Sequence, residues 1–314
     1  MFWRSGHAEA MPAAANTCAR PRSGVAWHLS IVPPFYGAIV GKLRCMVTPS
    51  SIFERLSSEL AETLVACRTD PGSHAVHSLR IAVRRIEALL HAIAEAHLRD
   101  ERLPVDAAKA LRQLKRVRRA AGPVRDLDVQ RRLIAEIITK ASASRSTKEQ
   151  TSLGGEARRL DARLHRQRKE LAEKLTSVVR RTEPKLERSL SALAETMAGW
   201  HPLSLLNMAR RLVLRSSLHL ENANSESLHL YRKQAKAARY LAEIETASVP
   251  ARRLAQTLKR VLDAIGRWHD LVLLAQGAKT VLGKQSTLAE TIRAERKQAW
   301  KLAMRSATSI HPMS

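Results

Sequence analysis

The sequence predicts an all-α protein: two pseudo-symmetric antiparallel helical bundles, of about four helices each plus long connecting helices, produced by an internal duplication. Two segments with helical periodicity and a cationic stripe, residues 76–90 and 228–241, support this prediction. A second pair of similar segments, residues 114–129 and 258–273, follows the first pair in the same order. Aromatic residues make up only 4% of the chain, and no long alternating run of β-branched residues occurs. The expected core is therefore aliphatic and helical.

The first pair of segments, VHSLRIAVRRIEALL and LHLYRKQAKAARYL, separates apolar and cationic side chains onto opposite helix faces. The cationic stripe holds His77, Arg80, Arg84 and His91 on the first helix and His229, Arg232, Lys236 and Arg239 on the second. A solvated helix face would carry interleaved acids for i,i+4 pairing, and the first stripe holds only Glu87. We therefore interpret both stripes as anion-binding faces.

The second pair, LKRVRRAAGPVRDLDV and LKRVLDAIGRWHDLVL, keeps several residues in register. The matches are Lys115 with Lys259, Gly122 with Gly266, Arg125 with His269, and Asp126 with Asp270. Lys115 and Arg119 can form a second cationic row on the helix that follows the first stripe. Asp126 and Asp270 each follow a Gly break, so we expect structural roles for them, as caps of the next helix or as partners of a neighbouring Arg.

Turn and capping residues divide the first part of the chain into helices. Ser50 or Ser51 can cap a helix over about residues 52–68, which ends before the sequence DPG at 70–72. The first cationic helix follows at about 73–98. Pro104 opens a helix over 105–121, Gly122-Pro123 is expected to stop it, and 125–142 forms the next. Residues 142–155 are rich in Ser, Thr and Gly and read as a linker.

Turn and capping residues divide the second part of the chain in the same way. A long charged helix is expected over 156–182, Pro184 begins one that ends near 199, and Pro202 begins one that reaches about 220. The loop ENANS at 221–225 precedes the second cationic helix, about 226–246. The last predicted helices cover 250–265, 268–282 and 286–306, with a break at Gly266.

This pattern divides the chain into four parts. Residues 1–46 lack helical periodicity, and we expect them to be disordered, or to lie upstream of a chain that starts at Met46. Residues 47–199 form the first bundle, 200–308 the second and 309–314 a tail. No apolar run reaches the roughly 18 residues that a spanning helix needs. Three scattered cysteines without a pairing or metal-binding pattern fit a reducing cytoplasm.

Charge indicates the kind of partner. Lys and Arg number 54 against 29 Asp and Glu, a formal net charge of +25. Such an excess predicts a polyanion: nucleic acid, an anionic membrane surface or polymeric phosphate. Arg binds phosphate oxygens through a planar fork of donors, and Lys binds them as a point charge. Rows of such groups on adjacent helices, doubled by the repeat, suit a long and regularly charged anion.

The motifs resemble the CHAD family, the conserved histidine α-helical domain. The first copy of the family pattern is carried by His77, Arg80, Arg84, Arg85, Lys115, Gly122, Arg125, Asp126 and Asp128. The second copy is carried by His229, Arg232, Lys236, Arg239, Tyr240, Lys259, Gly266, His269 and Asp270. The resemblance spans about residues 47–306, and it implies two helical bundles with a basic channel between them that binds inorganic polyphosphate. Two positions depart from the pattern: Glu87 replaces a commonly basic residue, and Ala237 stands where the first copy has Arg85.

The resulting hypothesis is non-enzymatic binding of polyphosphate, without a cofactor or metal, and attachment to polyphosphate granules. The candidate contact residues are His77, Arg80, Arg84, Arg85, Lys115, Arg119, Arg125, His229, Arg232, Lys236, Arg239, Lys259 and His269, with Gly122, Gly266, Asp126 and Asp270 as structural residues. Two alternatives remain open. The charge permits a nucleic-acid-binding protein, although stacking side chains are scarce near the motifs. His269-Asp270 is similar to the His-Asp pair of metal-dependent phosphohydrolases, but its counterpart is Arg125-Asp126.

Overall fold

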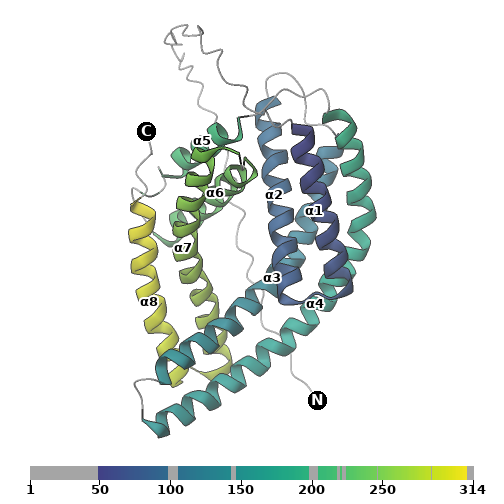
Figure 1. The fold of residues 1–314 in the computed structure, drawn as a ribbon. Coiled ribbons are helices and arrows are strands. Elements are labelled where there is room, and N and C mark those ends of the chain that lie inside the picture. Colours follow the sequence, from purple (N-terminus) through teal and green to yellow (C-terminus); the bar gives the residue numbers. More distant parts are fainter. Residues whose placement is uncertain are drawn as a thin grey trace, which may run out of the picture. The chain divides into compact units, whose positions relative to one another are not determined.

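Within the described residues the structure, a computed structural model, contains eight helices and no strand (Figure 1). The all-α fold class is therefore confirmed. The helices are α1 (Pro49–Thr69), α2 (Ser73–His97), α3 (Val105–Ser142), α4 (Thr147–Met197), α5 (Leu205–Ser217), α6 (Ser225–Ile244), α7 (Val249–Leu282) and α8 (Thr287–Thr308). The two cationic stripes of the sequence lie on α2 and α6.

The structure describes residues 49–97, 105–142, 146–197, 204–217, 220, 224–245, 247–283 and 285–309. Every described helix belongs to one compact unit. The predictions for residues 1–46, for a start at Met46 and for a tail after 309 fall outside the described residues. No described helix combines the length and the apolar character that crossing a bilayer requires.

Three helices are longer than the sequence pattern predicts. α3 continues through Gly122-Pro123, α4 starts at Thr147 and continues through Pro184, and α7 continues through Gly266. The predicted breaks at these positions, and most of the predicted linker at 142–155, are therefore wrong. A helix-interior Pro costs one backbone hydrogen bond, and a Gly costs about 1 kcal/mol relative to Ala. Buried side chains on both sides of each position, such as Val117 and Val124 around Pro123, offset these local costs.

The long helices connect two hydrophobic cores. The first core contains α1, α2, α5 and α6 with parts of α3, α4, α7 and α8, and its largest buried side chains include Phe53 and Tyr231. The second contains the remaining parts of α3, α4, α7 and α8, around Leu160 and Leu271. Each core takes residues from both sides of the predicted division at 199/200, which falls between α4 and α5. The two predicted bundles therefore share their cores.

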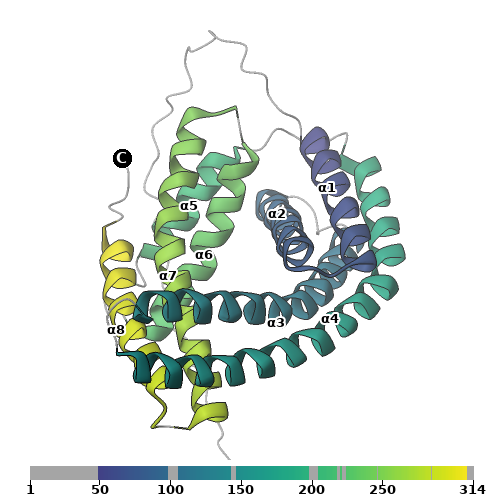
Figure 2. The same ribbon diagram turned by 60° about the horizontal axis from the view of Figure 1, so that its bottom comes forward.

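The packing order brings the motif-bearing helices together. α2 packs against α1, α3 and α6, and α6 packs against α5 and α7 as well as α2. α3 also contacts α7. Figure 2 shows α2 almost end-on, between α1 on one side and α6 on the other. The helices that carry corresponding motifs, α2 with α6 and α3 with α7, are thus direct neighbours.

A capping box fixes the start of α6. The Asn224 side chain accepts hydrogen bonds from the backbone N–H groups of Glu226 and Ser227, both at 2.9 Å. Ser227 Oγ in turn accepts a bond from the Asn224 N–H at 2.8 Å. This reciprocal pair satisfies donors that a helix start otherwise leaves without partners. It sets the register from which His229, Arg232 and Lys236 are presented.

We predict that Leu160→Ala lowers the free energy of unfolding by about 2–5 kcal/mol, because it leaves a cavity in the second core. Leu160 is fully buried there. The matched control is Leu302→Ala on α8, where the side chain is 55% exposed and the expected loss is below about 0.5 kcal/mol. Urea unfolding followed by circular dichroism measures both. Equal losses in the two variants would contradict the core assignment.

Candidate anion-binding site

Cations from α2 and α6 meet in one cluster. Arg80 of α2 lies within electrostatic range of Arg232 and Lys236 of α6. Arg84, one turn further along α2, acts on Lys236 as well. Side chains from the two predicted repeats therefore share one site, as the duplicated stripes suggest.

A groove of about 490 Å³ opens beside this cluster, between α2, α5 and α6. The basic side chains that line it are Arg84, His91, Arg118, His229, Arg232, Lys233 and Lys236. Apolar groups such as Ala88, Met208 and Leu212 form much of the remaining wall. Apolar walls with cations along two helices can hold an anion away from bulk water. Each ion pair is stronger inside such a groove than in bulk water.

The buried cations are incompletely neutralised. Arg232 Nε is buried and has no hydrogen-bond partner among the described residues. Burial is the main reason why the pKa of Arg232 is lowered. Burial, followed by the neighbouring Arg232, Arg84 and Arg80, lowers the pKa of Lys236 to about 7. Like charges that lack partners favour the binding of an anion.

Two motif glycines lie where the key arginines meet the neighbouring helices. A Cβ atom at Gly122 of α3 would lie 3.1 Å from Arg80 Nη1. A Cβ atom at Gly266 of α7 would lie 4.0 Å from Arg232 Nη2. The corresponding glycine thus faces the corresponding arginine in both halves. Only at Gly122 would the Cβ crowd the guanidinium group, because 4.0 Å is an ordinary van der Waals distance. Neither glycine ends a helix.

Asp126 and Asp270 lie inside α3 and α7, so the predicted helix-capping role is wrong. Both carboxylates instead lie within range of Arg232 and Lys236. Burial raises the pKa of each Asp, and these neighbouring cations act in the opposite direction. The two carboxylates therefore supply part of the countercharge that allows the cations to be buried.

The histidines lie at the edges of the cluster. The His229 and His269 rings are 6.1 Å apart between centroids. Burial, followed by Arg232, His229 and Lys236, lowers the pKa of His269 to about 4. Burial also lowers the pKa of His77, and Arg125 and Arg80 add to the effect. His269 is therefore neutral at pH 7 and can donate one hydrogen bond, and the lowered pKa of His77 favours its neutral form.

Three of the predicted contact residues are held by carboxylates. Arg85 contacts Glu59 at 3.1 Å and Glu243 at 3.8 Å. Arg239 contacts Glu243 at 3.2 Å and lies over the Tyr240 ring, 4.9 Å from its centroid. Lys259 contacts Asp263 at 2.8 Å. These ion pairs join helices or helix turns to one another.

The other predicted residues lie along α3. Lys115 and Arg119 are exposed, on the helix face that also carries Gly122 and Asp126. Arg125 lies deeper, and its Nη1 donates to Ser73 Oγ at 3.5 Å, at the start of α2. These residues can extend a cationic path away from the groove.

Sequence reasoning missed Arg118 as a groove residue. Its Nε donates to Glu87 at 2.9 Å, and Glu87 also lies 3.9 Å from Arg84. Glu87 therefore lies between two arginines of the groove wall. The spacing could have revealed this position, because Arg118 precedes Gly122 by four residues and shares its side of the helix.

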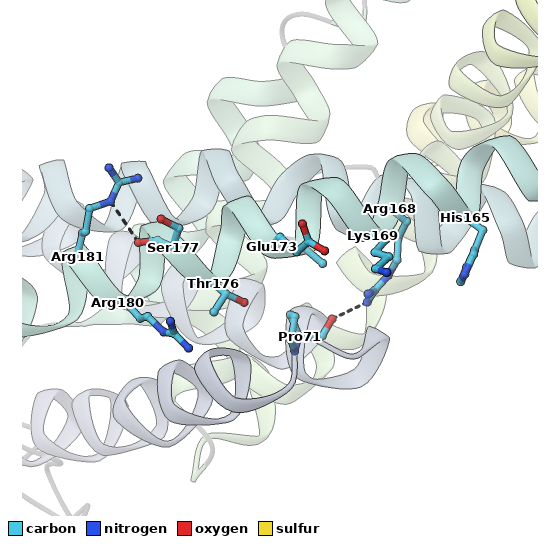
Figure 3. Close-up of a pocket in the computed structure, with 10 residues that line it drawn as sticks. Pro71, His165, Arg168, Lys169, Glu173, Thr176, Ser177, Arg180 and Arg181 are labelled. Atoms are coloured by element: carbon cyan, nitrogen blue, oxygen red, sulfur yellow. Dashed lines mark hydrogen bonds between the residues drawn. The ribbon is translucent and has the colours of Figure 1, made fainter.

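A second, larger pocket of about 660 Å³ lies between α4 and the turn before α2 (Figure 3). Its basic residues are His165, Arg168, Lys169, Arg180 and Arg181. Arg168 is engaged in hydrogen bonds within the protein, because it donates to Asp128 at 3.0 Å and to the Pro71 carbonyl. No predicted contact residue lines this pocket. We therefore treat the groove between α2 and α6 as the candidate site.

Potential metal ligands do not gather in the described part of the chain: it contains no cluster of three or more His, Cys, Asp or Glu side chains that could hold an ion. Asp270, which the phosphohydrolase alternative would use, has cationic neighbours in Arg232 and Lys236.

Comparisons with known proteins identify the family. The family model of the CHAD domain matches residues 51–279, whereas a comparison with curated proteins found no match. A solved structure, the crystal structure of the CHAD domain from the plant Ricinus communis, is similar to this chain with a TM-score of 0.60. The two share 16% sequence identity over 87% of this chain and 96% of that chain, a likeness that shows the fold. Because the family model spans most of the sequence, including both motif pairs, the chain belongs to the CHAD domain family.

Proposed function

We propose that this protein binds inorganic polyphosphate, without catalysis, in the groove between α2 and α6. One observation carries the proposal: cations from both motif-bearing helices converge on a site where they outnumber the carboxylates. The cations in and beside the groove are Arg80, Arg84, Arg118, Arg125, Arg232 and Lys236, and the carboxylates are Glu87, Glu95, Asp126 and Asp270. A linear anion with one negative charge per unit can neutralise several of these cations at once.

The groove offers little to the bases of a nucleic acid. Tyr240 is the aromatic side chain in its lining, and it is only 8% exposed. Trp268 packs against Trp300, with ring centroids 4.8 Å apart. Proteins that bind single strands stack bases on exposed aromatic rings. The chemistry of the groove therefore favours phosphate alone over phosphate with bases.

The proposed contact residues differ in how directly they are expected to bind the anion. Arg80, Arg84, Arg232 and Lys236 form the centre, and Lys115 and Arg119 extend the path along α3. Arg85, Arg239 and Lys259 serve the fold through their ion pairs. In a cell, such binding would attach the protein to polyphosphate granules in the cytoplasm.

Titration calorimetry with long-chain polyphosphate tests the proposal. We expect binding at low salt that weakens as salt is added, because binding releases counterions. Absence of binding at low salt would reject it. Displacement of polyphosphate by RNA or DNA at equal phosphate concentration would favour the nucleic-acid alternative. Phosphate release that needs a divalent metal and disappears in Asp270→Ala would favour a phosphohydrolase.

The double variant Arg80→Ala with Arg232→Ala should weaken polyphosphate binding by about 100-fold, because each lost charged contact costs about 1.4 kcal/mol or more. Helix content should stay unchanged. The matched control is Arg163→Ala with Arg166→Ala on α4, which removes the same charge from exposed positions outside the groove. Calorimetry and circular dichroism measure the two effects. Loss of fold in the groove variant would instead assign these arginines a structural role.

Glu87→Gln should strengthen polyphosphate binding by about tenfold, because it removes a negative charge from the groove wall and releases Arg84 and Arg118. It should also lower the free energy of unfolding by about 1 kcal/mol, since a charged hydrogen bond becomes a neutral one. Glu59→Gln removes a carboxylate that contacts Arg85 outside the groove lining and is the control. Equal affinities in both variants would show that Glu87 does not oppose the anion.

Polyphosphate affinity should fall as pH rises from 7 to 9. The pKa of Lys236 is about 7 in the free protein, and a bound polyanion raises it. Binding therefore takes up a proton in this range, so affinity is full below pH 7 and declines above it. Lys236→Arg, which keeps its charge, should remove this decline. Calorimetry at pH 8 in buffers of different ionisation enthalpy measures the proton uptake. An unchanged decline in the variant would assign it to another group.

A further inference from the structure

Lys236 combines burial with the lack of a polar partner among the described residues, which neither the exposed Lys115 nor the paired Lys259 does. Within the part of the chain that the structure describes, it makes no hydrogen bond or ion pair, although its side chain lines the groove. Lys259 is held by Asp263 at 2.8 Å. Lys233, three residues earlier on α6, lines the same groove but is exposed to solvent. Lys236 is thus a largely buried amine that still faces an open space.

The groups that face Lys236 come from several helices. Arg232 lies one turn earlier on α6, and Arg84 and Arg80 face it from α2. Asp270 and His269 face it from α7, and Asp126 faces it from α3. With a pKa of about 7, roughly half of the Lys236 side chains are neutral amines at pH 7. An ordinary lysine is neutral in only about one molecule in a thousand or fewer at that pH.

A neutral amine beside phosphate-binding arginines can react with a small molecule that carries both a phosphate and an activated acyl group. Arg232 and Lys236 are four residues apart, so their side chains are neighbours on one helix face. A small molecule whose phosphate binds Arg232 and Arg84 places its next atoms beside the amine of Lys236. If these atoms form an activated acyl group, the amine can attack it.

We propose that Lys236 is a site of acylation by small acyl phosphates, of which acetyl phosphate is the simplest. The proposal rests on the proposed function, because the same cations recognise the phosphate. The lone pair of Nζ forms a C–N bond with the acyl carbon, and the C–O bond to phosphate breaks. The phosphate leaves with that electron pair and takes the proton that the nitrogen loses. The products are acyl-lysine and hydrogen phosphate, and no oxidant or reductant takes part.

Acylation removes the charge of Lys236 and fills part of the groove. Modified protein should therefore bind polyphosphate more weakly. Conversely, bound polyphosphate covers Lys236 and should protect it from acylation. The groove would thus respond to the supply of acyl phosphates as well as to polyphosphate.

Mass spectrometry of the full-length protein, treated at pH 7.5 with acetyl phosphate or with uncharged acetic anhydride, tests the proposal. We expect the ratio of acetylation at Lys236 to that at Lys233 to be at least tenfold higher with acetyl phosphate. The two lysines share a helix and a groove, so the comparison isolates guidance by the phosphate. Equal ratios with both reagents would overturn the proposal.

Calorimetry with long-chain polyphosphate on the same preparation separates the two proposals. If the Lys236-to-Lys233 acetylation ratio is tenfold higher with acetyl phosphate but polyphosphate does not bind, the proposed function is rejected and the acylation site is retained. If polyphosphate binds but the acetylation ratio is the same with acetyl phosphate and acetic anhydride, only the acylation site is rejected.

Treated and untreated samples of wild type and Lys236→Arg give a second test. Acetyl phosphate should lower the polyphosphate affinity of the wild type by about tenfold and leave that of the variant at its own untreated value. Equal losses in both would assign the effect to other lysines and contradict the proposal.

Discussion

The constraint on which this structure depends is the burial of like charges beside one another. Arg80, Arg232 and Lys236 lie close enough to repel, and the groove surroundings remove much of the water that would screen them. Such an arrangement opposes folding, because buried charges cost free energy unless they are paired. It persists only because large apolar surfaces are buried elsewhere. The two hydrophobic cores, which run through both predicted repeats, supply that stabilisation.

The motif residues reduce this cost without removing the charge. Gly122 allows the guanidinium group of Arg80 to lie close against α3. Asp126 and Asp270 supply part of the countercharge from α3 and α7. Burial is the main reason why the pKa of Lys236 is lowered, and Arg232, Arg84 and Arg80 lower it more than Asp270 raises it. An anion from solution can therefore contribute what the protein itself lacks.

Periodicity was sufficient to place Arg80, Arg232 and Lys236 on the cationic faces of their helices. Arg80 and Arg232 occupy matching positions in two similar segments, and the helices that carry them are neighbours in the structure. Sequence rules for helix ends failed where tertiary packing opposed them. Pro123 and Gly266 are residues that typically end helices, yet α3 and α7 continue through them because side chains on both sides are buried.

The ion pairs of the site were predictable only where they are local. Arg239 with Glu243 and Lys259 with Asp263 are i,i+4 pairs and can be read from spacing. Arg85 with Glu59 and Arg118 with Glu87 join different helices, so only the fold reveals them. Periodicity specifies which face of a helix a side chain occupies, and it does not specify which distant residue meets that face.

The two halves of the site are related but unequal. In register, Glu87 of α2 corresponds to Arg239 of α6, so the two halves carry opposite charges at this position. Glu87 is neutralised from another helix by Arg118, whereas Arg239 is neutralised within its own helix by Glu243. The α6 wall of the groove therefore keeps its cations, while the α2 wall contains a carboxylate between two arginines. A linear anion in the groove would meet a more positive surface on α6, so the similar motifs of α2 and α6 do not make the two walls equivalent.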